Sequence, residues 1–154
     1  MCRYRAAPPG GIRQYVHMAR YVIGPDVALR LAQDRASVPD HHQLLAPTLI
    51  RSQLLSRLYQ SVRSGEIVKK DAERQLDHVR ALRLRLLGDR MLQSVAWKIA
   101  DQLDWPDTFD AEYLALTRLQ ADAFVTLDNS LIRAARGVVP TASIDALEPS
   151  SASS

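Results

Sequence analysis

Hydrophobic and polar positions alternate along the chain in two different periods. Short apolar runs bounded by glycine, proline or polar residues predict strands at 20–24, 82–87, 123–127 and 138–144. Apolar positions that repeat every three to four residues predict helices over 27–32, 49–62, 68–79, 91–103, 111–119 and 131–135. A further apolar run at 44–46 precedes Pro47, a residue suited to a helix start.

Strands and helices alternate along the chain, which is the order of βαβ units. Such units fold into a parallel sheet with helices packed on both faces. We therefore predict an α/β fold of three layers, with a mostly parallel sheet of about five strands. Residues 82–87 read Leu-Arg-Leu-Arg-Leu-Leu, so this strand should have one side in water and lie near a sheet edge.

The two ends of the chain differ in composition from the middle. Residues 1–17 contain three arginines, no acid and the sequence Ala-Pro-Pro-Gly-Gly, and are predicted to be a disordered extension. An arginine-bearing, acid-free start also occurs in transit peptides and in nucleic-acid-binding arms. Residues 147–154 are rich in serine and are predicted to be a disordered tail. One domain remains, over residues 18–146.

Composition places the chain among ordinary globular proteins. It has 154 residues, of which 47% are hydrophobic and 24% charged. The net charge of +3 is compatible with a polyanionic partner without requiring one. The single cysteine, Cys2, excludes a disulfide framework and a cysteine-based zinc site. The sequence has neither an apolar run of roughly 20 residues nor the apolar core of a secretory signal, so a cytoplasmic location is expected.

Three acidic residues lie near the ends of strands and helices where ligands bind in open parallel sheets. Asp26 follows the first strand, Asp128 ends the strand at 123–127, and Asp110 opens the helix before that strand. The carboxyl ends of parallel strands meet at one edge, so these carboxylates can share it. Carboxylates in proximity raise one another's pKa unless a cation lies between them, and oxygen ligands suit Mg²⁺ or Mn²⁺. The pattern predicts a metal site able to activate water against a phosphodiester.

Each acid taken singly also has an ordinary structural explanation. Asp26 and Asp128 could cap helices, and Asp110 could favour the positive end of its helix. Thr126, two residues before Asp128, could orient that carboxylate through its hydroxyl or simply pack in the strand. A receiver-like or small phosphatase fold also uses acids at strand ends. The sequence shows neither the late lysine nor the early acidic doublet that would support it.

Four segments together resemble the PIN-domain ribonucleases, specifically the VapC-type toxins of type II toxin-antitoxin pairs. They are DAEYLALT at Asp110, VTLD ending at Asp128, YVIGPDVALRLA around Asp26, and APTLIRSQLLSRL around Gln53. The resemblance spans residues 18–146 and implies a PIN-like fold. It implies an endoribonuclease that uses Mg²⁺, or alternatively Mn²⁺, with Asp26, Asp110 and Asp128 as catalytic residues and metal ligands. It also implies a homodimer, RNA as substrate, and a small VapB-type antitoxin that wraps the toxin and blocks the acidic pocket.

Two positions depart from the family pattern. An Asp usually ends the first strand, where this chain has Gly24, and the nearest carboxylate follows at Asp26. A Glu of the family is matched by Gln53, an amide that brings no negative charge. Fewer carboxylates should weaken affinity for the ion. The alternative hypothesis is therefore a catalytically weakened or inactive PIN-like module that binds RNA or an antitoxin-like partner.

Other charged residues near these segments have weaker support. Arginines 51, 57 and 63 lie along the same predicted helix as Gln53 and could reach RNA phosphate, although a charged helix face is commonly only solvated. Arg51, Gln53 and Thr126 are taken as supporting residues. A second acidic group, at positions 101, 104 and 107, is assigned to helix ends and solvent and left out of the site.

Overall fold

The computed structural model describes residues 18–149, and five parallel strands form one sheet in the order β3-β2-β1-β4-β5. The strands are β1 Arg20–Ile23, β2 Gln43–Pro47, β3 Arg85–Leu87, β4 Ala123–Val125 and β5 Thr141–Ala142. The helices within this range are α1 Pro25–Gln33, α2 Ile50–Arg63, α3 Lys69–Ala81, α4 Arg90–Gln102, α5 Phe109–Gln120, α6 Asn129–Ala135 and the 3₁₀ helix η1 Ile144–Leu147. The α/β fold with a parallel sheet is confirmed.

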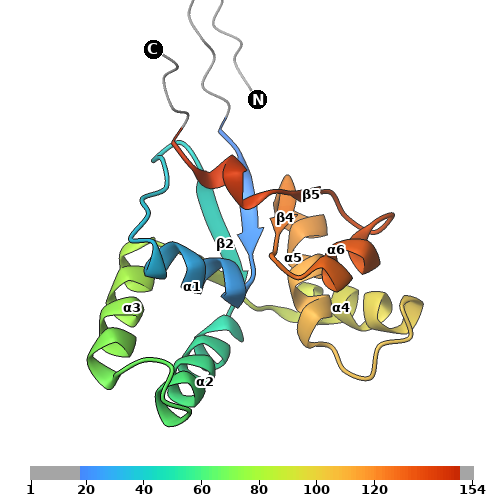
Figure 1. Ribbon diagram of the computed structural model, residues 1–154. Coiled ribbons are helices and arrows are strands. Elements are labelled where there is room, and N and C mark those ends of the chain that lie inside the picture. Colours follow the sequence, from blue (N-terminus) through green and yellow to red (C-terminus); the bar gives the residue numbers. More distant parts are fainter. Residues whose placement is uncertain (1–17, 150–154) are drawn as a thin grey trace, which may run out of the picture.

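Helices cover both faces of the sheet. Helices α1, α2 and α3 lie on one side of it, and α4, α5 and α6 lie on the other (Figure 1). The central strand β1 pairs with β2 and with β4, so that Tyr21 lies opposite Leu44 on one side and Ala123 on the other. Strand β3 is an edge strand, as the alternating apolar and basic residues predicted. No helix between residues 18 and 149 is long and apolar enough to cross a membrane.

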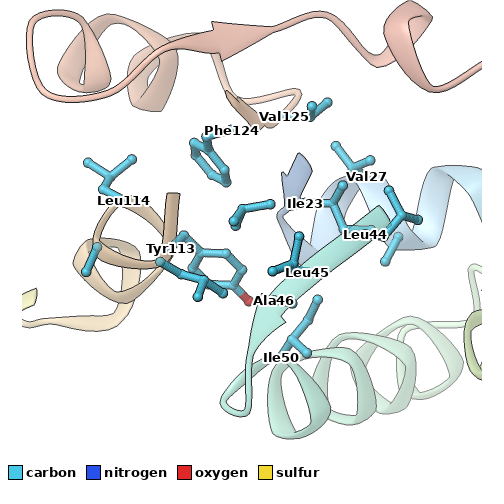
Figure 2. Packing of buried hydrophobic residues seen from close by; sticks show 14 of the residues in the cluster. Ile23, Val27, Leu44, Leu45, Ala46, Ile50, Tyr113, Leu114, Phe124 and Val125 are labelled. Atoms are coloured by element: carbon cyan, nitrogen blue, oxygen red, sulfur yellow. The ribbon is translucent and has the colours of Figure 1, made fainter. Parts of the chain in front are cut away.

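The core lies between the sheet and the helices. Because both faces of the sheet are covered, the middle strands are apolar on both sides: Val22, Leu45 and Val125 are each at most 1% exposed. Figure 2 shows Tyr113 reaching from α5 toward β2, with its ring near Phe124 and its hydroxyl oxygen near Ala46. The ring centroids of Tyr113 and Phe124 are 5.9 Å apart, a normal separation for packed aromatic rings.

Several predicted boundaries are wrong. The run at 44–46 belongs to strand β2, and Pro47 ends that strand instead of starting a helix. The last strand, expected over 138–144, is only Thr141–Ala142, and Ile144 begins η1. Val138 and Val139 instead donate their backbone N–H groups to the carbonyl of Ala135 at the end of α6.

The extent of the domain and of its core also differs from the prediction. Leu147, assigned to the tail, is fully buried, so the packed domain extends beyond residue 146. Met91 and Leu119 belong to the apolar periods that predicted their helices, yet they are 60% and 39% exposed, because each lies at the margin of its helix's buried face. The predicted extension over 1–17 and residues 150–154 of the predicted tail lie outside the described residues.

Candidate active site

The order of the strands creates a topological switch point at the carboxyl ends of β1 and β4. After β1 the chain turns to α1 on one face, and after β4 it turns to α6 on the other (Figure 1). In open parallel sheets, ligands bind where neighbouring strands lead to opposite faces. Asp26 follows β1 and Asp128 follows β4, so the structure places both acids at this point.

Three hydrogen bonds hold the carboxylate of Asp26. Its Oδ2 accepts from Thr126 Oγ1 and from the Leu127 backbone N–H, each at 2.8 Å. Its Oδ1 accepts from the Val27 backbone N–H at 2.9 Å. The acid after β1 is therefore fixed against the end of β4.

Gly24 explains how an acid three residues beyond the end of β1 reaches this place. A Cβ atom at residue 24 would lie 2.6 Å from Asp26 Oδ1, closer than non-bonded atoms can approach. The Asp26 carboxylate thus lies against the position where a side chain at the end of β1 would begin. The departure from the family pattern at Gly24 and the acid at Asp26 are spatially linked.

Thr126 joins the two loops of the site. It is 5% exposed, its hydroxyl donates to Asp26, and its Oγ1 accepts from the Asp128 backbone N–H at 3.2 Å. The expectation that Thr126 orients the Asp128 carboxylate is wrong. Its hydroxyl orients the carboxylate of Asp26 instead, because the chain turns after β4 and brings only the backbone of Asp128 back to it.

Replacing Thr126 by Val is expected to loosen the Asp26 carboxylate. Valine has almost the same shape but no hydroxyl, so a hydrogen bond to a charged group is lost, at a cost of about 2 kcal/mol. Chemical denaturation should show this loss of stability. Thr126→Ser, which keeps the hydroxyl, is the matched control and should recover most of it. If the Val and Ser variants are equally stable, the hydroxyl does not hold Asp26.

Asp128 is the N-cap of α6, as its capping explanation predicted. Its Oδ1 accepts from the backbone N–H groups of Ser130 at 2.9 Å and Leu131 at 3.2 Å. Both bonds use the same oxygen, so Oδ2 is not engaged by the cap. The capping role and a role in the site are therefore compatible.

Asp110 lies in the first turn of α5, and its pKa is raised. Part of the side chain meets solvent, but burial of the rest is the largest cause, followed by the negative charges of Asp107, Asp128 and Asp26. The positive charge of Arg57 acts in the opposite direction. Asp26 and Asp128 therefore lie close enough to Asp110 for their charges to act on it.

Two of these neighbours did not stand out in the sequence. Asp107 accepts from the Phe109 backbone N–H at 3.1 Å and so helps to begin α5, which is the capping role expected for it. It also adds negative charge beside Asp110, although it had been left out of the site. Arg57 was only one of three arginines on its helix, and no local pattern separated it from the others.

Gln53 is tied to α5 rather than directed only at solvent. Its Oε1 accepts from the hydroxyl of Tyr113 at 2.5 Å, and Tyr113 is 1% exposed. Burial is the main reason that the pKa of Tyr113 is raised well above its ordinary value, so the phenol stays protonated and can donate. Arg51 lies two residues from Gln53, about 200° around the helix, and therefore on another side of α2.

The residues fit a divalent cation in their chemistry. Carboxylate oxygens are the ligands that Mg²⁺ and Mn²⁺ prefer, and a cation would relieve the repulsion that raises the pKa of Asp110. Within residues 18–149, however, no three His, Cys, Asp or Glu side chains form a group able to hold a metal ion as they stand. The acids share one edge, and ligation would require their side chains to move closer together.

A large hollow lies at the opposite ends of the strands, away from the acids. Its volume is about 1360 Å³, and its walls include Arg20, Gln43 and Asp122 at the amino ends of the strands. None of the three predicted acids lines it. The size of a hollow therefore does not locate the site. The site is identified by the chemistry of the acids and by the strand order.

Comparisons with known proteins agree with this architecture. No protein-family model and no curated protein matches the chain. Among solved structures, PAE2754 from Pyrobaculum aerophilum is similar with a TM-score of 0.65 and 18% identity, over 84% of this chain and 93% of that one. The protein has a PIN-like fold. VapBC-1 from nontypeable Haemophilus influenzae is similar with a TM-score of 0.54 and 12% identity, over 82% and 98% of the two chains. At these identities the likeness shows the fold alone.

Proposed function

We propose that the protein is a metal-dependent endoribonuclease that hydrolyses RNA phosphodiesters and acts as the toxin of a toxin-antitoxin pair. The observation that carries this proposal is the gathering of Asp26, Asp110 and Asp128 at the carboxyl edge of a parallel sheet, where the negative charges of Asp128 and Asp26 help to raise the pKa of Asp110. The PIN-like fold and the sequence resemblance to VapC-type toxins support it.

The three carboxylates would hold Mg²⁺, or alternatively Mn²⁺. Such an ion, when bound, lowers the pKa of a bound water and neutralises charge on the phosphodiester. Asp26 is held in place by three hydrogen bonds and offers a preorganised oxygen position. Asp128 offers Oδ2 while its Oδ1 caps α6. Asp110 adds the third carboxylate from α5, which lies on the other side of the sheet from α1 (Figure 1).

We further propose RNA as substrate, a small VapB-type antitoxin as partner and a homodimer as the assembled form. The resemblance to VapC-type toxins and the structural likeness to VapBC-1 support these assignments. The surface also carries large apolar side chains that a partner could cover. Those of Leu55, Tyr59 and Trp97 are 59%, 61% and 68% exposed.

Cleavage of RNA by the purified protein tests the proposal. The protein is freed of any small protein that copurifies and is incubated with end-labelled single-stranded and structured RNA in Mg²⁺ or Mn²⁺. Discrete products are expected, EDTA should stop their formation, and excess Mn²⁺ should restore it. The Asp110→Asn variant, purified in the same way, controls for contaminating nucleases. If both proteins give the same products, or neither gives any, the proposed activity is overturned.

The same Asp110→Asn variant is expected to melt higher than the wild type when no divalent ion is present. The pKa of Asp110 is raised in the folded protein, so ionising this group above that pKa costs stability. Removing the charge should raise the melting temperature at pH 7 by about 2 °C, allowing for partial exposure. The difference should disappear as the pH falls and the wild-type carboxyl becomes protonated. Thermal melts at pH 7 and pH 4 measure it, with Asp40→Asn, an exposed loop acid, as control.

A further inference from the structure

One face of α2 lies toward the acids and carries a positive charge. Gln53 and Arg57 are four residues apart on this helix and therefore project from the same side. On α5, Asp110 and Tyr113 are three residues apart and likewise share a side. The bond from the Tyr113 hydroxyl to Gln53 joins these two faces and holds Arg57 near the acids.

Arg57 lies close enough to Asp110 and Tyr113 for its positive charge to act on both. The ion pair found within residues 18–149 joins Arg80 to Asp77, on α3, so the guanidinium of Arg57 is not held in a salt bridge by the acids. Its side chain is exposed. Its hydrogen-bond donors therefore remain available to a ligand at the site.

An anionic substrate needs such a group at this edge. Asp26, Asp107, Asp110 and Asp128 together repel a phosphate that approaches them. A guanidinium on the facing helix offsets this repulsion and can donate two parallel hydrogen bonds to phosphate oxygens. The other arginines of α2 do not act on Asp110 in this way: Arg51 projects from another side, and Arg63 ends the helix, where its Nη1 lies 3.4 Å from the Tyr59 hydroxyl.

We infer that Arg57 binds an RNA phosphate beside the three carboxylates and so positions the phosphodiester that is cut. This inference rests on the proposed function and deepens it, because it assigns the substrate-holding role to a residue of α2. Gln53 and Tyr113 act as positioning residues that hold the face of α2 on which Arg57 lies.

Arg57→Gln is compared with Arg63→Gln, a matched loss of charge on the same helix, and with Arg57→Lys. Cleavage rates over a range of RNA concentrations give KM and kcat, and fluorescence anisotropy gives RNA binding in an Asp110→Asn background. Arg57→Gln should raise KM and weaken binding about 10-fold, and the loss of one phosphate contact should lower the salt dependence of log Kd by about 0.7. Arg57→Lys should recover part of the affinity, and Arg63→Gln should lie within about 2-fold of the wild type.

The outcomes separate this inference from the proposed function. If Arg57→Gln and Arg63→Gln change KM and binding equally, Arg57 is only part of a solvated helix face and the inference is overturned. If Arg57→Gln changes the pH profile of kcat but not KM or binding, Arg57 acts only on the ionisation of Asp110, which also overturns it. If the wild type cuts no RNA, the proposed function fails, and the inference of a phosphate-binding Arg57 stands only if the binding difference between the two variants remains.

Discussion

An Asp128→Asn variant is expected to lose RNA cleavage on the order of 100-fold or more at pH 7 while melting within about 2 °C of the wild-type protein. Asparagine keeps an oxygen that can accept from the Ser130 and Leu131 N–H groups, and it is as good an N-cap as aspartate. What it removes is the negative charge at the carboxyl end of β4. The variant therefore separates the structural role of Asp128 from its chemical role.

Three measurements together check the Asp128→Asn prediction. Cleavage rates and thermal melts are compared with those of Asp145→Asn, an exposed acid in the first turn of η1 that should change neither. NMR titration should show a lower pKa for Asp110 in the Asp128→Asn variant, because one of the charges that raises it is gone. Wild-type cleavage with a shifted melting temperature would mean that Asp128 is only a helix cap.

An Asp26→Asn variant is expected to lose both cleavage and stability. Three donors converge on the two carboxylate oxygens of Asp26: the Val27 N–H, the Thr126 hydroxyl and the Leu127 N–H. An amide offers one acceptor oxygen, so its NH₂ group must face at least one of these donors. Leaving such groups unsatisfied should cost about 3 kcal/mol and lower the melting temperature by about 10 °C.

Asp122→Asn is the matched control for Asp26→Asn. Asp122 accepts a single hydrogen bond, from the Arg20 backbone N–H at 2.8 Å, which an asparagine oxygen can also accept. It lies at the amino end of β4, away from the acids. Denaturant unfolding should show little change for this control. If Asp26→Asn is equally harmless, the three hydrogen bonds do not anchor the site as the geometry indicates.

The layered architecture was predictable because its signals are local. Alternation of strand and helix periods predicted a parallel sheet covered on both faces, and the alternating arginines of 82–87 predicted an edge strand. The prediction failed where a short apolar run has no period of its own. Val138 and Val139 have high strand propensity, yet they form the turn after α6, because backbone bonds to Ala135 outweigh that propensity.

By itself, the sequence determined which acids follow the strands. Asp128 comes directly after an apolar run, Asp26 follows another across Gly24 and Pro25, and Asp110 opens a helix. Only the tertiary structure decided what these acids contact. Thr126 and Asp26 are 100 residues apart along the chain, and Tyr113 and Gln53 are 60 apart. Helix and strand periods report which face a residue lies on within its own element. They carry no information about which distant element packs opposite, and that packing set the partner of Thr126 and brought Arg57 toward the acids.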